Sequence, residues 1–82
     1  MTKLEEKLIE LGYEEIYPNY EKEVGDNTIV IDLNWTNDKI TDASIRLYMD
    51  CVYLDSVEQH IINLRKTEKV LKHDLEVLEN VE

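Results

Sequence analysis

The stretch TIVIDLNW at residues 28–35 decides the fold, because its apolar and polar side chains alternate with a period of two. Successive side chains of a strand point to opposite faces of a sheet. One face of this segment therefore carries four apolar residues, Ile29, Ile31, Leu33 and Trp35. The other face carries Thr28, Val30, Asp32 and Asn34. The pattern predicts a half-buried strand, the strongest in the chain.

Short turns on both sides of this strand predict two neighbours. The sequence GDN at residues 25–27 is typical of a tight turn after a strand at about residues 15–24, where Pro18 favours an edge position or a bulge. A second turn, NDK at residues 37–39, leads into a third strand at about 40–53. The core-facing side of that strand is expected to hold Ala43, Ile45, Leu47, Met49 and Cys51. The three strands form an antiparallel meander.

A short helix precedes the meander. Thr2 and Glu5 have the spacing of a capping box, in which each side chain accepts a hydrogen bond from the other residue's backbone. Leucines then recur at helical spacing, and Gly12 supplies a left-handed stop. We expect this helix at residues 3–11.

A long helix follows the meander at about residues 56–80, with Asp55 as its cap and Glu58 completing a second capping box. Its apolar seam is made of Val57, Ile61, Leu64, Leu71, Leu75 and Leu78. At 1.5 Å per residue it is about 37 Å long, more than a three-stranded sheet covers. Two interpretations follow: the helix packs against its own sheet, or it also pairs with a second copy through Leu71, Leu75 and Leu78. The predicted fold is α+β, in the order αβββα.

Composition restricts the class of protein. With 82 residues the chain is expected to form one domain, residues 1–82, with little room for a deep enzyme cleft. A hydrophobic content of 43% indicates a folded chain although the net charge is −10. The single cysteine excludes an internal disulfide framework, and no apolar run is long enough for a membrane span. A cytoplasmic location is expected.

Sequence motifs for catalysis or cofactor binding are missing. A zinc site is the alternative for Cys51, His60 and His73, together with Asp55, but their spacing matches no zinc signature and the histidines are more than three helical turns apart. Cys51 is expected in the core, where a thiol is inert. We expect no metal, no cofactor and no enzymatic activity.

Charge is distributed unevenly along the chain. Residues 10–38 hold a single base, Lys22, against eight acids: Glu10, Glu14, Glu15, Glu21, Glu23, Asp26, Asp32 and Asp38. Bases gather on the long helix at Arg65, Lys66, Lys69 and Lys72. Such a surface repels nucleic acid over most of the molecule and favours attraction of a basic protein, so direct nucleic-acid binding is disfavoured.

Tyrosines interleave with these acids. Tyr13, Tyr17 and Tyr20 lie among them, and Tyr48 is expected on the outer sheet face. Tyrosine gives rigid contact area and accepts guanidinium stacking, so these residues are candidate anchors for an arginine-rich partner. The alternative is that they cover the core and the acids only add solubility.

The acidic segment GYEEIYPNYE at residues 12–21, with the small size and the helix–meander–helix order, resembles small phage-encoded anti-CRISPR proteins. The segments LEEKLIELGY at 4–13 and DLEVLEN at 74–80 also look like short phage accessory proteins. The first resemblance implies an inhibitor that occupies the basic surface of a CRISPR effector nuclease, as the DNA mimics among those proteins do. On this interpretation the partner-binding residues are Glu14, Glu15, Tyr17, Tyr20, Glu21, Glu23 and Asp26, with carboxylates replacing phosphates. The alternative is a self-associating accessory or adaptor protein with no role related to nucleic acid.

Overall fold

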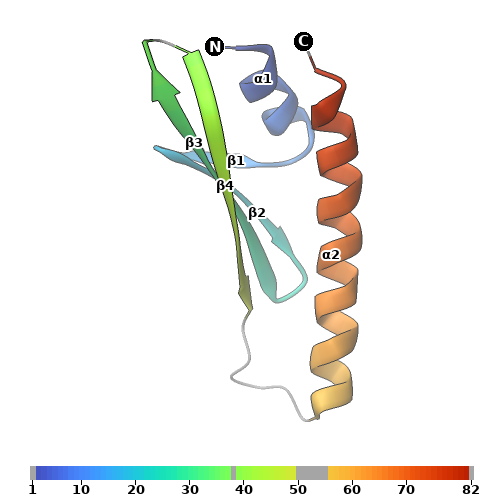
Figure 1. Ribbon diagram of the computed structural model, residues 1–82. Helices are drawn as coiled ribbons and strands as arrows, with labels where there is room; N and C mark the ends of the chain where they lie inside the picture. Colours follow the sequence, from blue (N-terminus) through green and yellow to red (C-terminus); the bar gives the residue numbers. More distant parts are fainter. Residues whose placement is uncertain (1, 38, 50–55, 82) are drawn as a thin grey trace.

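The computed structural model describes residues 2–37, 39–49 and 56–81, which form an α+β fold (Figure 1). The elements are α1 (Lys3–Glu10), β1 (Glu14–Ile16), β2 (Asn19–Val24), β3 (Asn27–Thr36), β4 (Lys39–Met49) and α2 (Val57–Glu79). All neighbouring strands are antiparallel, and their spatial order is β1-β2-β3-β4. The α+β class, the antiparallel sheet and the long C-terminal helix are confirmed.

The sheet has four strands, so the prediction of three is wrong. The segment predicted as one strand at 15–24 is a hairpin, in which Glu15 pairs with Tyr20 and the turn contains a cis peptide between Tyr17 and Pro18. Pro18 has no N–H to donate to a neighbouring strand, so the strand ends there. The sequence predicted an edge position or a bulge at Pro18, whereas the proline lies in a turn, and the inward-facing positions change from odd numbers in β1 to even numbers in β2.

The capping box of α1 is present as predicted. The Glu5 amide donates to Thr2 Oγ1 at 3.2 Å, and the Thr2 amide donates to Glu5 Oε1 at 3.1 Å. The helix ends at Glu10, and Gly12 has a φ of 98°, the left-handed conformation expected of the stop. The capping box fixes the orientation of the Glu5 side chain.

The N-cap of the long helix is one residue later than predicted, at Ser56 in place of Asp55, and the helix begins at Val57. Ser56 is the N-cap, and its side chain accepts a hydrogen bond from the Gln59 amide at 3.2 Å. A serine side chain satisfies a free N–H at this position as well as an aspartate does. Asp55, Cys51 and the predicted strand residues 50–53 lie outside the described residues.

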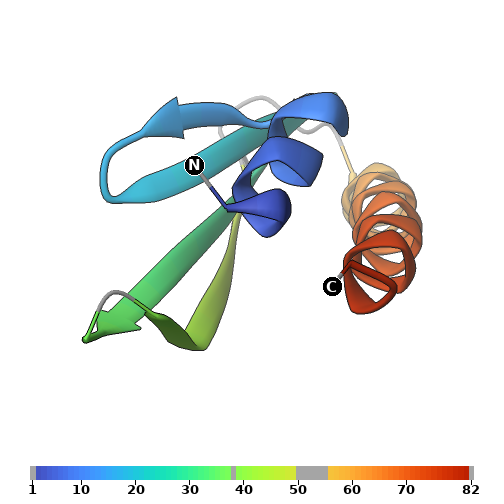
Figure 2. The ribbon, with the colours of Figure 1, turned by 90° about the horizontal axis from the view of Figure 1, so that it is seen from above.

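Both helices lie on the same side of the sheet, which we call the inner face (Figure 2). The core contains Leu8, Tyr13, Tyr20, Ile29, Ile31 and Leu33, and half-buried residues of α2 pack against it, including Val70, Leu71 and Leu78. Helix α2 contacts β2, β3 and α1. Strand β4 is less covered: Ala43 is exposed and Ile45 is 40% exposed, so the predicted core face of this strand is open over part of its length.

Two polar residues of α2 are fully buried. Thr67 accepts a hydrogen bond from Asn27 Nδ2 at 2.8 Å, which joins α2 to the start of β3. Asp74 joins α2 to Tyr13 and to Lys22 of β2. Buried polar groups need such partners, because an unpaired one costs about 1–3 kcal/mol.

Candidate functional site

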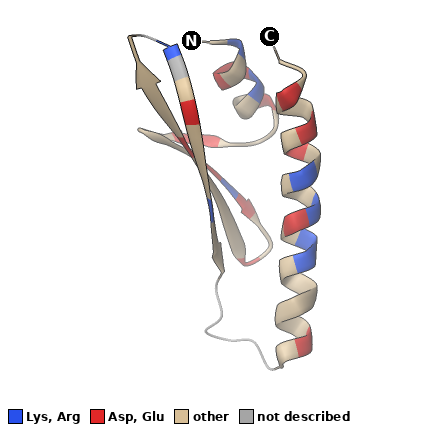
Figure 3. Ribbon diagram, viewed as in Figure 1, with Lys and Arg blue, Asp and Glu red and all other residues tan. Residues whose placement is uncertain are grey.

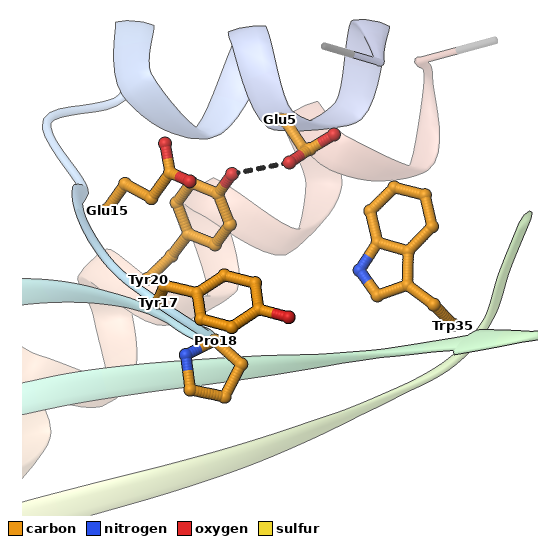
Figure 4. A pocket seen from close by; sticks show the side chains of 6 residues that line it. All are labelled: Glu5, Glu15, Tyr17, Pro18, Tyr20 and Trp35. Atoms are coloured by element: carbon orange, nitrogen blue, oxygen red, sulfur yellow. Dashed lines mark hydrogen bonds between the residues drawn. The ribbon is translucent and has the colours of Figure 1, made fainter. Parts of the chain in front are cut away.

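A pocket of about 240 Å³ opens where α1, the β1–β2 hairpin and the end of β3 meet (Figure 4). It is lined by three aromatic rings, a proline and two carboxylates: Tyr17, Tyr20, Trp35, Pro18, Glu5 and Glu15. Figure 4 shows Trp35 across the opening from Tyr17 and Tyr20, with Glu5 reaching in from α1. The site therefore combines flat apolar surfaces with negative charge.

Glu5 is held in place by both of its oxygens. Its Oε1 accepts hydrogen bonds from Thr2, and its Oε2 accepts one from the Tyr20 hydroxyl at 2.7 Å. The Tyr20 hydrogen bond and those from Thr2 keep the pKa of Glu5 below its usual value. Burial and the neighbouring Glu5 carboxylate raise the pKa of Tyr20. At neutral pH the pocket therefore holds a fixed carboxylate beside a protonated phenol.

The two outer aromatic rings of the pocket face solvent. Tyr17 is 87% exposed and Trp35 is 44% exposed. Trp35 follows an irregularity in the β3–β4 register, where Asn34 pairs with Asp42 and Trp35 with Ile40; the extra residue is on β4, so Trp35 stays on the face that begins at Ile29 and lies at its open end. Exposed aromatic rings beside carboxylates form the kind of surface that attracts organic cations, because a ring face is negative and a carboxylate adds charge.

A second tyrosine–carboxylate pair lies in the core and already holds a cation. The Tyr13 hydroxyl donates to Asp74 Oδ2 at 2.9 Å, and Lys22 Nζ approaches the same oxygen at 2.9 Å. Lys22 Nζ is also 5.2 Å from the centre of the Tyr13 ring. The carboxylate of Asp74 is 1% exposed.

The electrostatics of this buried pair follow from its contacts. Burial alone would raise the pKa of Asp74, but hydrogen bonds from Lys22, His73 and Tyr13 outweigh burial and hold that pKa below its usual value. Burial raises the pKa of Tyr13, and Asp74 raises it further. The tyrosine, the carboxylate and the lysine thus form a neutralised set inside the protein.

The structure divides the seven predicted partner-binding residues between two surfaces. Glu15, Tyr17 and Tyr20 line the pocket, although Tyr20 is only 3% exposed. Strand alternation places Glu14, Glu21 and Glu23 on the outer face of the sheet, opposite the helices, and Asp26 in the β2–β3 turn. Figure 3 shows acids on the strands and the predicted bases in the middle of α2.

Three pocket residues escaped sequence reasoning: Glu5, Pro18 and Trp35. Glu5 was identified only as a capping residue, Pro18 only as an interruption, and Trp35 only as part of the core row. No local signal joins them, because they come from three separate elements. The spacing of Glu5 in the capping box did predict its fixed orientation.

The remaining predicted residues lie elsewhere. Leu71, Leu75 and Leu78 are half-buried within the chain, where Leu71 and Leu78 pack on the core. His73 Nδ1 is 3.1 Å from Asp74 Oδ1. In residues 2–37, 39–49 and 56–81, no three His, Cys, Asp or Glu side chains are grouped so that they hold a common ion.

Neither helix in the described part of the chain combines the length and hydrophobicity that a membrane span requires. No family model, curated protein or solved structure matches the chain. Function is therefore inferred from the geometry of the pocket and its surroundings.

Proposed function

We propose that this protein is a non-enzymatic inhibitor that binds the basic surface of a nucleic-acid-binding protein, and that an arginine or lysine of that partner enters the pocket. The observation that supports this proposal is the lining of the pocket. It contains Glu5, Glu15 and three aromatic rings, and none of its described lining residues is basic.

The size of the pocket favours one side chain over a whole small molecule. Sites for drug-sized ligands measure about 300–1,000 Å³, and this cavity is about 240 Å³. A guanidinium group stacks on an aromatic face and pairs with a carboxylate at the same time. Tyr17 and Trp35 offer the faces, and Glu5 offers an oriented carboxylate.

Acids outside the pocket give the interaction its long-range attraction. Glu14 and Glu21 lie on the two strands of the β1–β2 hairpin, Glu23 and Asp26 lie toward the β2–β3 turn at the other end of β2, and the whole chain has a net charge of −10. Such a field speeds the encounter with a basic partner and weakens with salt. A CRISPR effector nuclease is the specific partner that we propose, with carboxylates occupying positions where it binds phosphates.

Binding of an arginine-rich peptide tests the pocket directly. We expect fluorescence anisotropy to show salt-sensitive binding of the labelled peptide, and weaker binding of the same peptide with citrulline, a neutral analogue, in place of arginine. Tyr17→Ala and Glu15→Gln should each weaken arginine-peptide binding roughly tenfold, the loss expected for one desolvated cation–π contact or ion pair.

Two matched variants control for composition. Tyr48→Ala removes an exposed tyrosine outside the pocket, and Glu68→Gln removes an exposed acid on α2. Both should bind the peptide as the wild type does. Equal losses in the control and pocket variants would mean that charge alone attracts the peptide, and the pocket assignment would be wrong.

Inhibition is tested separately with purified CRISPR effector nuclease. Excess wild-type protein should reduce target-DNA binding by the nuclease, and Tyr17→Ala should restore it. Unchanged DNA binding in the presence of a protein that still binds the arginine peptide would reject the inhibitor function while leaving the cation pocket intact.

A further inference from the structure

Strand β4 lies at one end of the strand order β1-β2-β3-β4. It spans Lys39–Met49 and contains no proline. Its other neighbour in the sheet is β3, and within the part of the chain that the structure describes no strand pairs with its second edge. An edge strand of this length is a template for pairing with another strand; in the single chain the Ala43 amide donates to Asp42 Oδ1 at 2.8 Å.

The charge of β4 differs from that of the other strands. Strands β1, β2 and β3 together carry a single base, Lys22, against Glu14, Glu15, Glu21, Glu23 and Asp32. Strand β4 carries Lys39 and Arg46 against Asp42 (Figure 3). Two copies of this acidic protein therefore approach with the least repulsion along β4.

The order of charges along β4 is self-complementary. In an antiparallel pair related by a two-fold axis normal to the sheet, pairing that places Ser44 opposite Ser44 of a second copy also places Asp42 opposite Arg46, twice. Moving the axis to Asp42 or to Arg46 puts like charges opposite each other. All three are outer-face positions, since they alternate with Ala43 and Ile45.

The same register matches the apolar side of the strand. Ala43 lies opposite Ile45 of the second copy, and Ile45 opposite Ala43. In the single chain Ala43 is exposed and Ile45 is 40% exposed, because α2 packs over β2 and β3 instead. Pairing brings these uncovered residues of two copies together and removes part of their surface from water.

We propose that the protein forms a homodimer by antiparallel pairing of β4 with β4, centred on Ser44, so that two four-stranded sheets become one continuous sheet. The partner is a second copy of this chain. The leucines of α2 are not required for this dimer, since Leu71 and Leu78 already pack inside the chain. Because β1 and β4 are opposite edges of the sheet, pairing leaves the Tyr17–Pro18 turn open in both copies.

A charge exchange tests the register by sedimentation velocity over a range of protein concentrations. Wild-type protein should shift from monomer to dimer as concentration rises. Asp42→Arg places like charges opposite each other at two symmetric positions and should raise the dimer dissociation constant at least about tenfold. The double variant Asp42→Arg with Arg46→Asp should recover dimerisation, because each strand again presents an acid opposite a base.

The control is Glu68→Arg, which makes the same change of charge at an exposed position of α2 and should leave the dimer unchanged. Circular dichroism of every variant verifies the fold. A wild-type protein that stays monomeric at all concentrations overturns the proposal. A dimer that Asp42→Arg does not weaken, or that the double variant does not recover, overturns the β4 register. Peptide binding by the pocket is measured independently, so the two proposals fail separately.

Discussion

Two tyrosine–carboxylate pairs in this small protein differ in their burial and in the presence of a cation. Tyr13 and Asp74 are buried, and Lys22 lies against both of them. Tyr20 and Glu5 form a similar pair at the wall of an open pocket, and no described lysine or arginine lines that pocket. In the buried pair, the amino group of Lys22 contacts both the carboxylate and the tyrosine ring. The comparison indicates that the open pair is suited to a cation from outside the chain.

The largest expected effect comes from breaking the buried set. Asp74→Asn removes the charge that compensates Lys22 and should lower the free energy of unfolding by about 2–4 kcal/mol. Urea denaturation measures this as a lower midpoint with an unchanged slope. Glu5→Gln makes the same chemical change in the open pair and should cost about 1 kcal/mol or less, because Glu5 is partly solvated. Equal losses in the two variants would contradict the distinction between them.

The pH dependence of stability is the next largest effect. A carboxyl group whose pKa is lowered by folding stabilises the protein fully above its unfolded pKa, and that contribution is lost as pH falls through the lower folded value. The pKa of Asp74 is lowered in this way. The free energy of unfolding should therefore fall from about pH 4 downward.

Urea midpoints measured across the acid range determine this slope. Asp74→Asn should show a shallower decline than the wild type, because one of the responsible groups is gone. Glu5→Gln should also flatten the decline, since the pKa of Glu5 is lowered as well. Identical acid slopes in the wild type and in Asp74→Asn would show that other carboxyl groups control acid unfolding.

The sequence predicted the framework because helices and strands have local signals. Alternation at 28–35 gave β3, and the spacing of Thr2 and Glu5 gave the start of α1. Helix α2 was located correctly, but its core-facing side was read only from leucines, valines and isoleucines. The residues of α2 that are fully buried are Thr67 and Asp74, and polar residues carry no signal of burial in a single sequence.

The candidate site was predictable in part for a similar reason. From the sequence, the tyrosines were either anchors for a partner or residues that cover the core. In the structure Tyr13 and Tyr20 are buried in the core, and Tyr17 and Tyr48 are exposed. The acid-rich stretch at residues 10–38 was identified by composition, but the β1–β2 hairpin within it was predicted as one strand. Trp35 reaches the pocket because β3 pairs with β2, and Glu5 reaches it because α1 packs beside the sheet. Both are tertiary contacts, and no spacing along the chain encodes them.

The smallest expected effects come from removing single hydroxyl groups, and they rank the tyrosines by their role. Tyr13→Phe should lower the free energy of unfolding by about 1–2 kcal/mol, because buried Asp74 loses a donor. Tyr20→Phe should cost about 1 kcal/mol through Glu5. Tyr17→Phe should leave stability within about 0.5 kcal/mol of the wild type, since its side chain is exposed.

The Tyr17 variants also separate the ring from the hydroxyl in binding. Tyr17→Phe keeps the aromatic face and should bind the arginine-rich peptide like the wild type, whereas Tyr17→Ala should not. Loss of binding in Tyr17→Phe would mean that the hydroxyl, and not the ring, contacts the cation. A stability loss at Tyr17 as large as that at Tyr13 would place both tyrosines in the same structural role, and the contrast between the closed pair and the open pocket would no longer hold.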